Sequence, residues 1–137
     1  MIDLAILLAL QSEGICEYGL TGFWNESPIR SDGSITTGEG LWVIATTKDG
    51  VSRQGVYTDE ISVATRYNDP VEQAKKLLAL AKFVQNFKPC ELDCGEFLDQ
   101  RFRVLDLRQD EGFNLDSVDT EGRFVKSFSF RIQYMLL

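Results

Sequence analysis

The clearest hydrophobic pattern in the chain is the alternation in its last segment, from Phe124 to Leu136. Apolar residues occupy nearly every second position there, and polar or charged residues occupy most of the positions between them. The apolar positions are Phe124, Phe128, Phe130, Ile132, Tyr134 and Leu136, interrupted only by Lys126. A period of two is typical of a β-strand with one buried face. We therefore predict a final strand that is buried at the centre of a sheet or against an adjacent subunit.

A helical period follows Asp69. Asp69 suits the cap position, Pro70 suits the first helical position, and Glu72 has the spacing of a capping box. The apolar stripe predicted for this helix comprises Val71, Ala74, Leu77, Leu78, Ala81, Val84 and Phe87. Polar residues fall largely on the other side, so the pattern predicts a long amphipathic helix that docks one face on a sheet.

Propensity and turn residues predict the remaining elements. Residues 2–11 favour a buried helix that stops at Gly14. A weak strand at 18–24 precedes a polar segment, residues 25–40, that is predicted to form a long exposed loop. A hairpin is predicted over 41–57, with its turn at Lys48-Asp49-Gly50. It is followed by a strand over 60–67 with Ile61, Val63, Thr65 and Tyr67 on one face. Short strands are predicted within 90–119, and a turn at Thr120-Glu121-Gly122 precedes the final strand.

This order of elements predicts the fold class. Strands that pair largely with their sequence neighbours, with helices on one face, form an α+β layered fold. We expect a mostly antiparallel sheet, with the N-terminal helix and the long amphipathic helix packed on one face. A length of 137 residues is typical of a single domain with its own core.

The charge balance argues against binding to nucleic acid. Fourteen Lys and Arg stand against twenty-one Asp and Glu, a net charge of -7 that repels phosphates unless the basic residues form one patch. The densest basic stretches, Lys75-Lys76 and the series Arg101, Arg103 and Arg108, are interleaved with acidic or apolar residues, as on a solvated face. The apolar N-terminal segment contains Asp3 and no basic region, so we expect neither a signal peptide nor a membrane anchor.

Residues for catalysis or metal binding are sparse. The sequence has no histidine, the commonest general base, and none of the usual nucleophile, phosphate or dinucleotide motifs. Its three cysteines, Cys16, Cys90 and Cys94, form no CxxC pair and are expected to be reduced and mostly buried. Two acidic clusters contain oxygen ligands suited to Mg²⁺ or Ca²⁺: Asp106, Asp110 and Glu111, and Asp116, Asp119 and Glu121. Solvated carboxylates at turns explain both clusters better, and we expect no cofactor.

Two turn motifs give the segment from Ile61 to Leu136 a family resemblance. The first is an Arg near the end of a strand, followed by an Asp-containing turn into the main helix: Arg66, Asn68 and Asp69. The second is an acid-Gly-Arg turn before the last strand: Asp119, Glu121, Gly122 and Arg123. In these features the chain resembles the tail terminator proteins of long-tailed bacteriophages, also called tail completion or minor capsid proteins. The N-terminal half matches only in the order of its elements, and residues 25–40 have no counterpart.

The resemblance implies a structural protein of the virion, made in the bacterial cytoplasm and placed at the head-tail junction. Such a protein forms a homo-hexameric ring on the finished tail tube, stops its polymerisation, and offers a docking surface to the head-closure or connector protein. The partners are therefore further copies of the chain, the tail tube protein and the connector, with no catalysis and no membrane. An acidic lumen would let DNA pass without specific binding.

Ring closure requires two different contact surfaces on each subunit. The candidate interface residues are Trp24, Asn25, Arg30, Asp32, Glu39, Trp42, Arg66, Arg101, Arg103 and Arg123. The sequence leaves open whether the two tryptophans anchor an interface or pack in the core, and whether Arg101 and Arg103 meet a partner or solvent. Residues 25–40 are expected to order on a neighbouring subunit, the tube or the connector.

Three classes of function remain open at this point. The first is the ring protein. The second is another head-tail adaptor, a tail tube subunit, or an unrelated monomeric binding module with the same layered fold. The third is a metal-dependent enzyme that uses the acidic clusters.

Overall fold

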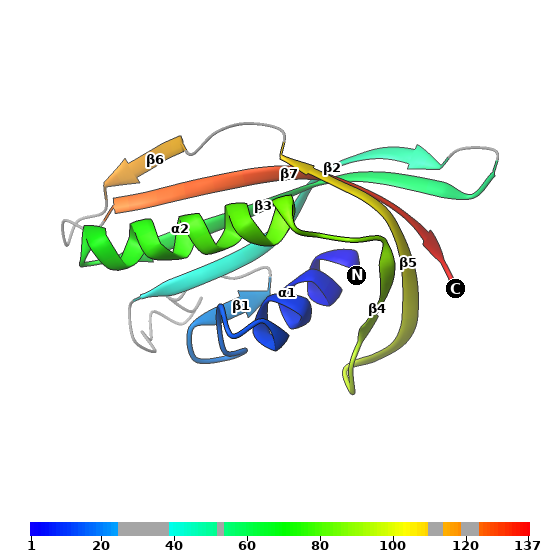
Figure 1. Ribbon diagram of the computed structural model, residues 1–137, viewed down its shortest axis with the longest axis horizontal. Helices are drawn as coiled ribbons and strands as arrows, with labels where there is room; N and C mark the ends of the chain where they lie inside the picture. Colours follow the sequence, from blue (N-terminus) through cyan, green and yellow to red (C-terminus); the bar gives the residue numbers. More distant parts are fainter. Residues whose placement is uncertain (25–38, 52–53, 110–113, 119–123) are drawn as a thin grey trace.

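A computed structural model of the chain describes residues 1–24, 39–51, 54–109, 114–118 and 124–137 (Figure 1). These residues form the following elements in chain order: α1 (Ile2–Ser12), β1 (Gly22–Trp24), β2 (Gly40–Val51), β3 (Val56–Tyr67), α2 (Pro70–Gln85), β4 (Cys90–Cys94), β5 (Leu98–Gln109), β6 (Asn114–Val118) and β7 (Phe124–Leu136). The class is α+β, as the order of elements predicts. Neither helix is long and apolar enough to cross a membrane.

The strands form one mixed sheet with the order β1-β2-β3-β7-β5-β4. β1 pairs in parallel with β2, and the other pairs are antiparallel. β7 lies inside the sheet. It pairs with β3 along one side, and along its other side it pairs with β6 in its N-terminal part and with β5 in its C-terminal part. The alternation of the final segment therefore corresponds to an interior strand, as predicted.

One face of the sheet carries most of the apolar core. On β3, the predicted face of Ile61, Val63, Thr65 and Tyr67 is buried. Register places these residues beside the alternating positions of β7, with Ile61 opposite Phe130 and Val63 opposite Phe128. The buried side chains of β7 include Phe128, Phe130, Ile132 and Tyr134, whereas Leu136, which the alternation also places on this face, is exposed.

Both helices contribute to the same core as this face of the sheet (Figure 1). α1 contacts β1, β2 and β4, and α2 contacts β3, β5 and β7. α1 is buried along most of its length, which explains why its sequence is apolar in nearly every position. Its buried apolar residues are Ile2, Leu4, Ala5, Ile6, Leu7 and Leu10.

The start of α2 agrees with the prediction at Asp69 and Pro70, whereas its buried face agrees with the predicted stripe only at Leu77 and Val84. Oδ1 of Asp69 accepts a hydrogen bond from the Val71 N–H at 2.9 Å, and Pro70 opens the helix. The buried residues are Gln73, Leu77, Leu80 and Val84, whereas the predicted stripe members Val71, Ala74 and Leu78 are exposed.

The buried face of α2 differs from the predicted apolar stripe because it includes a polar residue, Gln73. The amide of Gln73 donates to the backbone oxygen of Thr65 at 3.3 Å and interacts with the Thr65 hydroxyl at 3.2 Å. Hydrogen bonding compensates for much of the cost of removing an amide from water, so a helix face that includes a glutamine can lie on the sheet.

The predicted turn of the β2–β3 hairpin is also wrong in position. Asp49 and Gly50 lie within β2, which continues to Val51, and β3 begins at Val56. The pairing of the two strands shifts register twice, between Ala45 and Thr47 and between Lys48 and Val51. Such irregularities allow a strand to continue past a sequence that often forms a turn.

Two other predicted features differ or cannot be compared. The weak strand at 18–24 is reduced to β1, with an isolated bridge between Tyr18 and Gly22. The greater part of the predicted loop, residues 25–38, and the turn at 120–122 lie outside the described residues.

We expect Gly40→Ala to lower the free energy of unfolding by roughly 1–3 kcal/mol. Gly40 has φ of +148°, and a Cβ there would lie 2.8 Å from the backbone oxygen of Thr21. That same oxygen accepts the Leu41 N–H at 2.9 Å, so the clash would weaken the junction of β1 and β2. Urea denaturation measures the loss.

Gly55→Ala is the matched control. Gly55 also has a positive φ, +77°, but a Cβ there meets no heavy atom within 4 Å. It should therefore incur backbone strain without the collision. A loss at Gly40 no larger than the loss at Gly55 would contradict the role assigned to the contact with Thr21.

Candidate functional site

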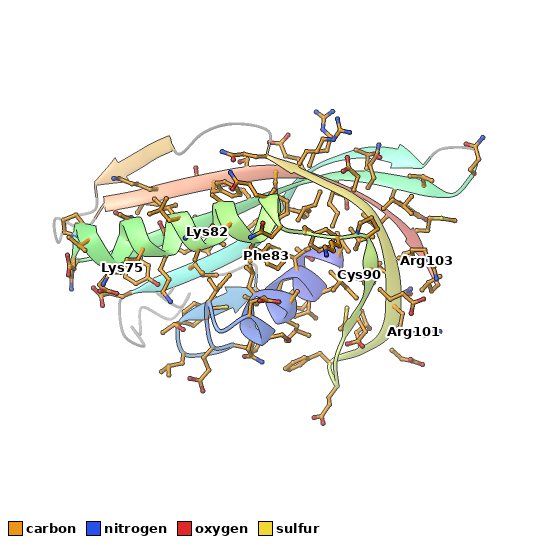
Figure 2. The ribbon with its side chains drawn as sticks, viewed as in Figure 1. Lys75, Lys82, Phe83, Cys90, Arg101 and Arg103 are labelled. Carbon is orange, nitrogen blue, oxygen red and sulfur yellow. The ribbon has the colours of Figure 1, made fainter. Side chains whose placement is uncertain are left out.

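A groove of about 530 Å³ lies between the C-terminal parts of α1 and α2 and the strand β4. Its apolar part includes Ile15, Phe83, Phe87 and Leu92. Charged and polar side chains at the groove include Glu13, Lys82, Lys88 and Cys90. We call this feature the basic groove, after its two lysines. Figure 2 labels Lys82 and Phe83 on α2 and Cys90 at the start of β4.

The local sequence at the end of α2 shapes the groove. Phe83 lies in the last turn of α2 and Phe87 lies just after its end, and their ring centroids are 5.8 Å apart in an edge-to-face arrangement. α2 ends at Gln85, and Pro89 prevents its continuation, so the chain enters β4 directly. β4 then brings Cys90 and Leu92 to the same hollow.

A contact between the two helical regions fixes the groove from its other side. Nζ of Lys76 on α2 donates to the backbone oxygen of Ile15, just after α1, at 2.6 Å. Ile15 also closes the end of α1, because its N–H donates to the oxygen of Leu10 at 3.0 Å. The groove is therefore enclosed by elements held together by hydrogen bonds.

The groove is lined by more basic than acidic residues, although the chain as a whole is acidic. Lys82 and Lys88 are both exposed, and neither forms an ion pair with any side chain in the part of the protein that the structure describes. Glu13 is the single acidic residue among the lining residues. An apolar hollow beside two lysines suits a group that is apolar at its centre and acidic at its edge.

The cysteines differ from each other in exposure. Cys16 and Cys94 are buried and Cys90 is exposed, so the thiols are mostly buried, as expected. Cys90 is the first residue of β4, a strand at the end of the sheet, and that position leaves its side chain at the groove surface. Burial raises the pKa of each thiol, and it raises that of Cys16 to about 11.

Arg101 and Arg103 lie on β5 and face solvent beside Glu91 of β4 (Figure 2). Arg103 Nη2 is 2.8 Å from Glu91 Oε1, and Arg101 Nη1 is 3.7 Å from Glu91 Oε2. Glu91 and Arg103 are directly opposite each other in the register, so this is a cross-strand pair. The acid group that Arg101 and Arg103 contact in this structure is therefore Glu91 of the same chain.

The other predicted interface residues are divided between the two faces of the sheet. Trp24 packs against the core and donates a hydrogen bond to the carboxylate of Asp3. Trp42 and Arg66 point to the face away from the helices, where Trp42 is half-buried and Arg66 is only 4% exposed. Glu39 Oε1 accepts the Asn68 N–H at 2.7 Å, which ties the start of β2 to the turn before α2.

The remaining candidates belong to segments that the structure does not describe. Asn25, Arg30, Asp32 and Arg123 lie outside the described residues, as do most members of the acidic clusters. Of those clusters, Asp106 forms an ion pair with Arg108 at 2.7 Å. Within the described ranges, no group of three or more cysteine, aspartate or glutamate residues is arranged to hold a metal ion.

Sequence reasoning missed the basic groove. Phe83 belongs to no predicted stripe, Phe87 belongs to the predicted buried stripe, and Lys82 is one of the polar residues expected on the exposed side of α2. The available signal was the aromatic pair at positions 83 and 87, followed at once by Lys88 and Pro89. This pair spans the end of the helix, outside the buried face, so its rings can line a hollow at the surface.

Comparison with known proteins adds no relative. No protein-family model matches the chain, and no curated protein matches it.

We expect Asp3→Asn to lower the free energy of unfolding near neutral pH by about 1–3 kcal/mol. Asp3 is 3% exposed, and its carboxylate accepts from the N-terminal ammonium at 2.8 Å and from the Leu4 N–H at 3.0 Å. Burial alone would raise the pKa of Asp3. The ammonium, the side chain of Trp24 and the Leu4 N–H together outweigh it, and the pKa is lowered from 3.8.

The sign of this shift fixes the pH dependence. A carboxyl with a lower pKa in the folded state contributes stability above its unfolded pKa and loses it as pH falls through the folded value. The difference between wild type and Asp3→Asn should therefore shrink below about pH 4 in urea denaturation at several pH values. Glu17→Gln, at an exposed glutamate, should have little effect at any pH. A constant difference across this range would contradict the prediction.

Thiol labelling provides a check of the groove surface. In the folded chain, a disulfide reagent should react rapidly with one of the three thiols, Cys90. The rate should rise with pH because the thiolate is the reactive form, and burial raises the pKa at which this thiolate forms. Denaturant should expose the remaining two. Cys90→Ser should remove the rapid phase, and equal reaction of all three thiols in the folded chain would contradict the burial described here.

Proposed function

We propose that this chain is a structural protein of a bacteriophage virion that resembles a tail terminator and forms a ring on the end of the tail tube. In this role it stops polymerisation of the tube and provides the docking surface for the head-closure or connector protein. It acts through contact surfaces, without a catalytic centre or a cofactor.

The observation that carries the proposal is the junction between β3 and α2. Arg66 is buried one residue before the end of β3, the Asn68 N–H donates to Glu39, and Asp69 caps α2 by accepting the Val71 N–H. These residues form the first of the two turn motifs on which the family resemblance depends. We take α2 as the long amphipathic helix of that architecture, packed on one face of a sheet whose interior strand is β7.

Exposed apolar side chains support a role in assembly. Val71 and Leu78 are 59% and 56% exposed and lie seven residues apart, on one side of α2. Phe97 and Leu98 form a second exposed apolar pair, at the connection between β4 and β5. Apolar groups on separate parts of the surface are consistent with the two different contacts that a ring subunit needs.

The charge of the chain is compatible with a lumen through which DNA passes. A net charge of -7 disfavours binding to phosphates, so DNA would move past the subunits without specific contact. The proposed place is therefore the head-tail junction of the virion. The proposed partners are other copies of the chain, the tail tube protein and the connector.

Mass measurement and electron microscopy test this function. The purified chain, alone or added to tubes of the tail tube protein from the same genome, should give a hexameric ring in native mass spectrometry or at tube ends. It should also stop tube elongation. Growth of the chain itself into long tubes would identify a tube subunit instead. A chain that neither forms rings nor binds tube ends would contradict the proposal.

A further inference from the structure

The connection between β4 and β5 presents an apolar pair flanked by acids. Phe97 and Leu98 are 59% and 39% exposed, and Glu96 and Asp99 stand on either side of them. We call residues 96–99 the acidic tip. It projects from the end of the β4–β5 hairpin, away from α2 (Figure 1).

The acidic tip has a defined conformation. Asp93 Oδ1 accepts the Gly95 N–H at 2.8 Å, and the backbone oxygen of Cys94 accepts the Phe97 N–H at 3.2 Å. Gly95 has φ of +59°, a left-handed conformation that glycine adopts without strain. The ring of Phe97 also contacts Tyr18, with centroids 5.0 Å apart. A pre-ordered segment loses less conformational entropy when it binds.

The acidic tip and the basic groove are complementary in both polarity and charge. The tip has an apolar centre with acids at its edges, and the groove has an apolar lining that includes Phe83 and Phe87, with Lys82 and Lys88 beside it. A volume of about 530 Å³ has room for two large apolar side chains. Lys82 and Lys88 also have no ion-pair partner within the described ranges.

We infer that the acidic tip of one copy docks in the basic groove of a second copy. Phe97 and Leu98 would enter the apolar part of the groove, while Glu96 and Asp99 would meet the two lysines. This inference deepens the proposed ring function and rests on it, since it names the surfaces through which successive subunits meet.

The chain's own tip lies at the end of β4 opposite to Cys90. The groove includes Cys90 and Leu92, whereas the tip follows Cys94 at the far end of β4. Extended chain rises by about 3.3 Å per residue, so Cys90 and Cys94 are roughly 13 Å apart along the strand. A contact between two different surfaces on different copies is heterologous, the kind of contact that closes a ring.

A cysteine placed in the tip tests the contact directly, because the groove already contains the exposed thiol of Cys90. Glu96→Cys, oxidised at mildly alkaline pH, should give a ladder of disulfide-linked oligomers on a non-reducing gel. Closure onto Cys90 of the same chain is disfavoured because a disulfide requires Cα atoms within about 7 Å. Adding Cys90→Ser should abolish the ladder. Gln133→Cys, at an exposed position of β7 on the opposite face, should not form one with Cys90.

Charge exchange provides the second test. Lys82→Glu with Lys88→Glu should weaken association at least about tenfold in sedimentation, and so should Glu96→Lys with Asp99→Lys. An equimolar mixture of the two variants should regain association, because each supplies the surface that the other has lost. Phe97→Ser should weaken association with little loss of folding stability, since the side chain is largely exposed.

The outcomes separate this inference from the proposed function. A ring that forms without the cross-link and tolerates Phe97→Ser would overturn the tip-groove contact and leave the ring function standing. A reciprocal dimer with the cross-link would support the contact and contradict the ring. A chain that stays monomeric at all concentrations and on tubes would overturn both.

Discussion

The pairing of β3 with β7 is the constraint on which the rest of the structure depends. Twelve consecutive residue pairs, from Val56 with Met135 to Tyr67 with Phe124, hold the two strands in one antiparallel register. That register aligns the buried apolar residues of both strands on one face, where each large side chain contributes about 1.5–3 kcal/mol through burial. A shift by one residue would turn this face to solvent. α2 and the strands β5 and β6 take their places on the surface and edge that this pair provides.

Hydrogen bonds between buried polar groups further stabilise this register of β3 and β7. Oγ1 of Thr65 donates to the backbone oxygen of Lys126 at 2.9 Å, and the amide of Gln73 lies 3.2 Å from the same hydroxyl. The hydroxyl of Tyr134 donates to Oδ2 of Asp59 at 2.7 Å, and this bond together with burial raises the pKa of Tyr134. Such groups are costly to bury unpaired, so a different packing of α2 or a different register would lose stability through them as well.

Sequence patterns predicted the elements whose signal is local. The alternation of β7 and β3 and the cap at Asp69 reflect residues that are close together along the chain. Where the prediction failed, a distant contact decided the outcome: Gln73 is buried because Thr65 lies beneath it, and β2 continues past Gly50 because β3 remains beside it. The basic groove was missed for the same reason, since it forms only when Ile15, Phe83 and Leu92 come together from separate elements. No periodicity within a single segment encodes such a hollow.

In the proposed assembly, β4 links the two surfaces of each subunit. Its first residues contribute to the basic groove, and its last residues lead into the acidic tip, while pairing with β5 holds the strand between them. β5 is in turn paired with β7, so the relative orientation of groove and tip is set by the sheet. The angle between successive copies would then follow from the twist of this part of the sheet, and not from the conformation of a long loop. A fixed angle at each heterologous contact is what determines whether a chain of subunits closes into a ring or continues as a filament.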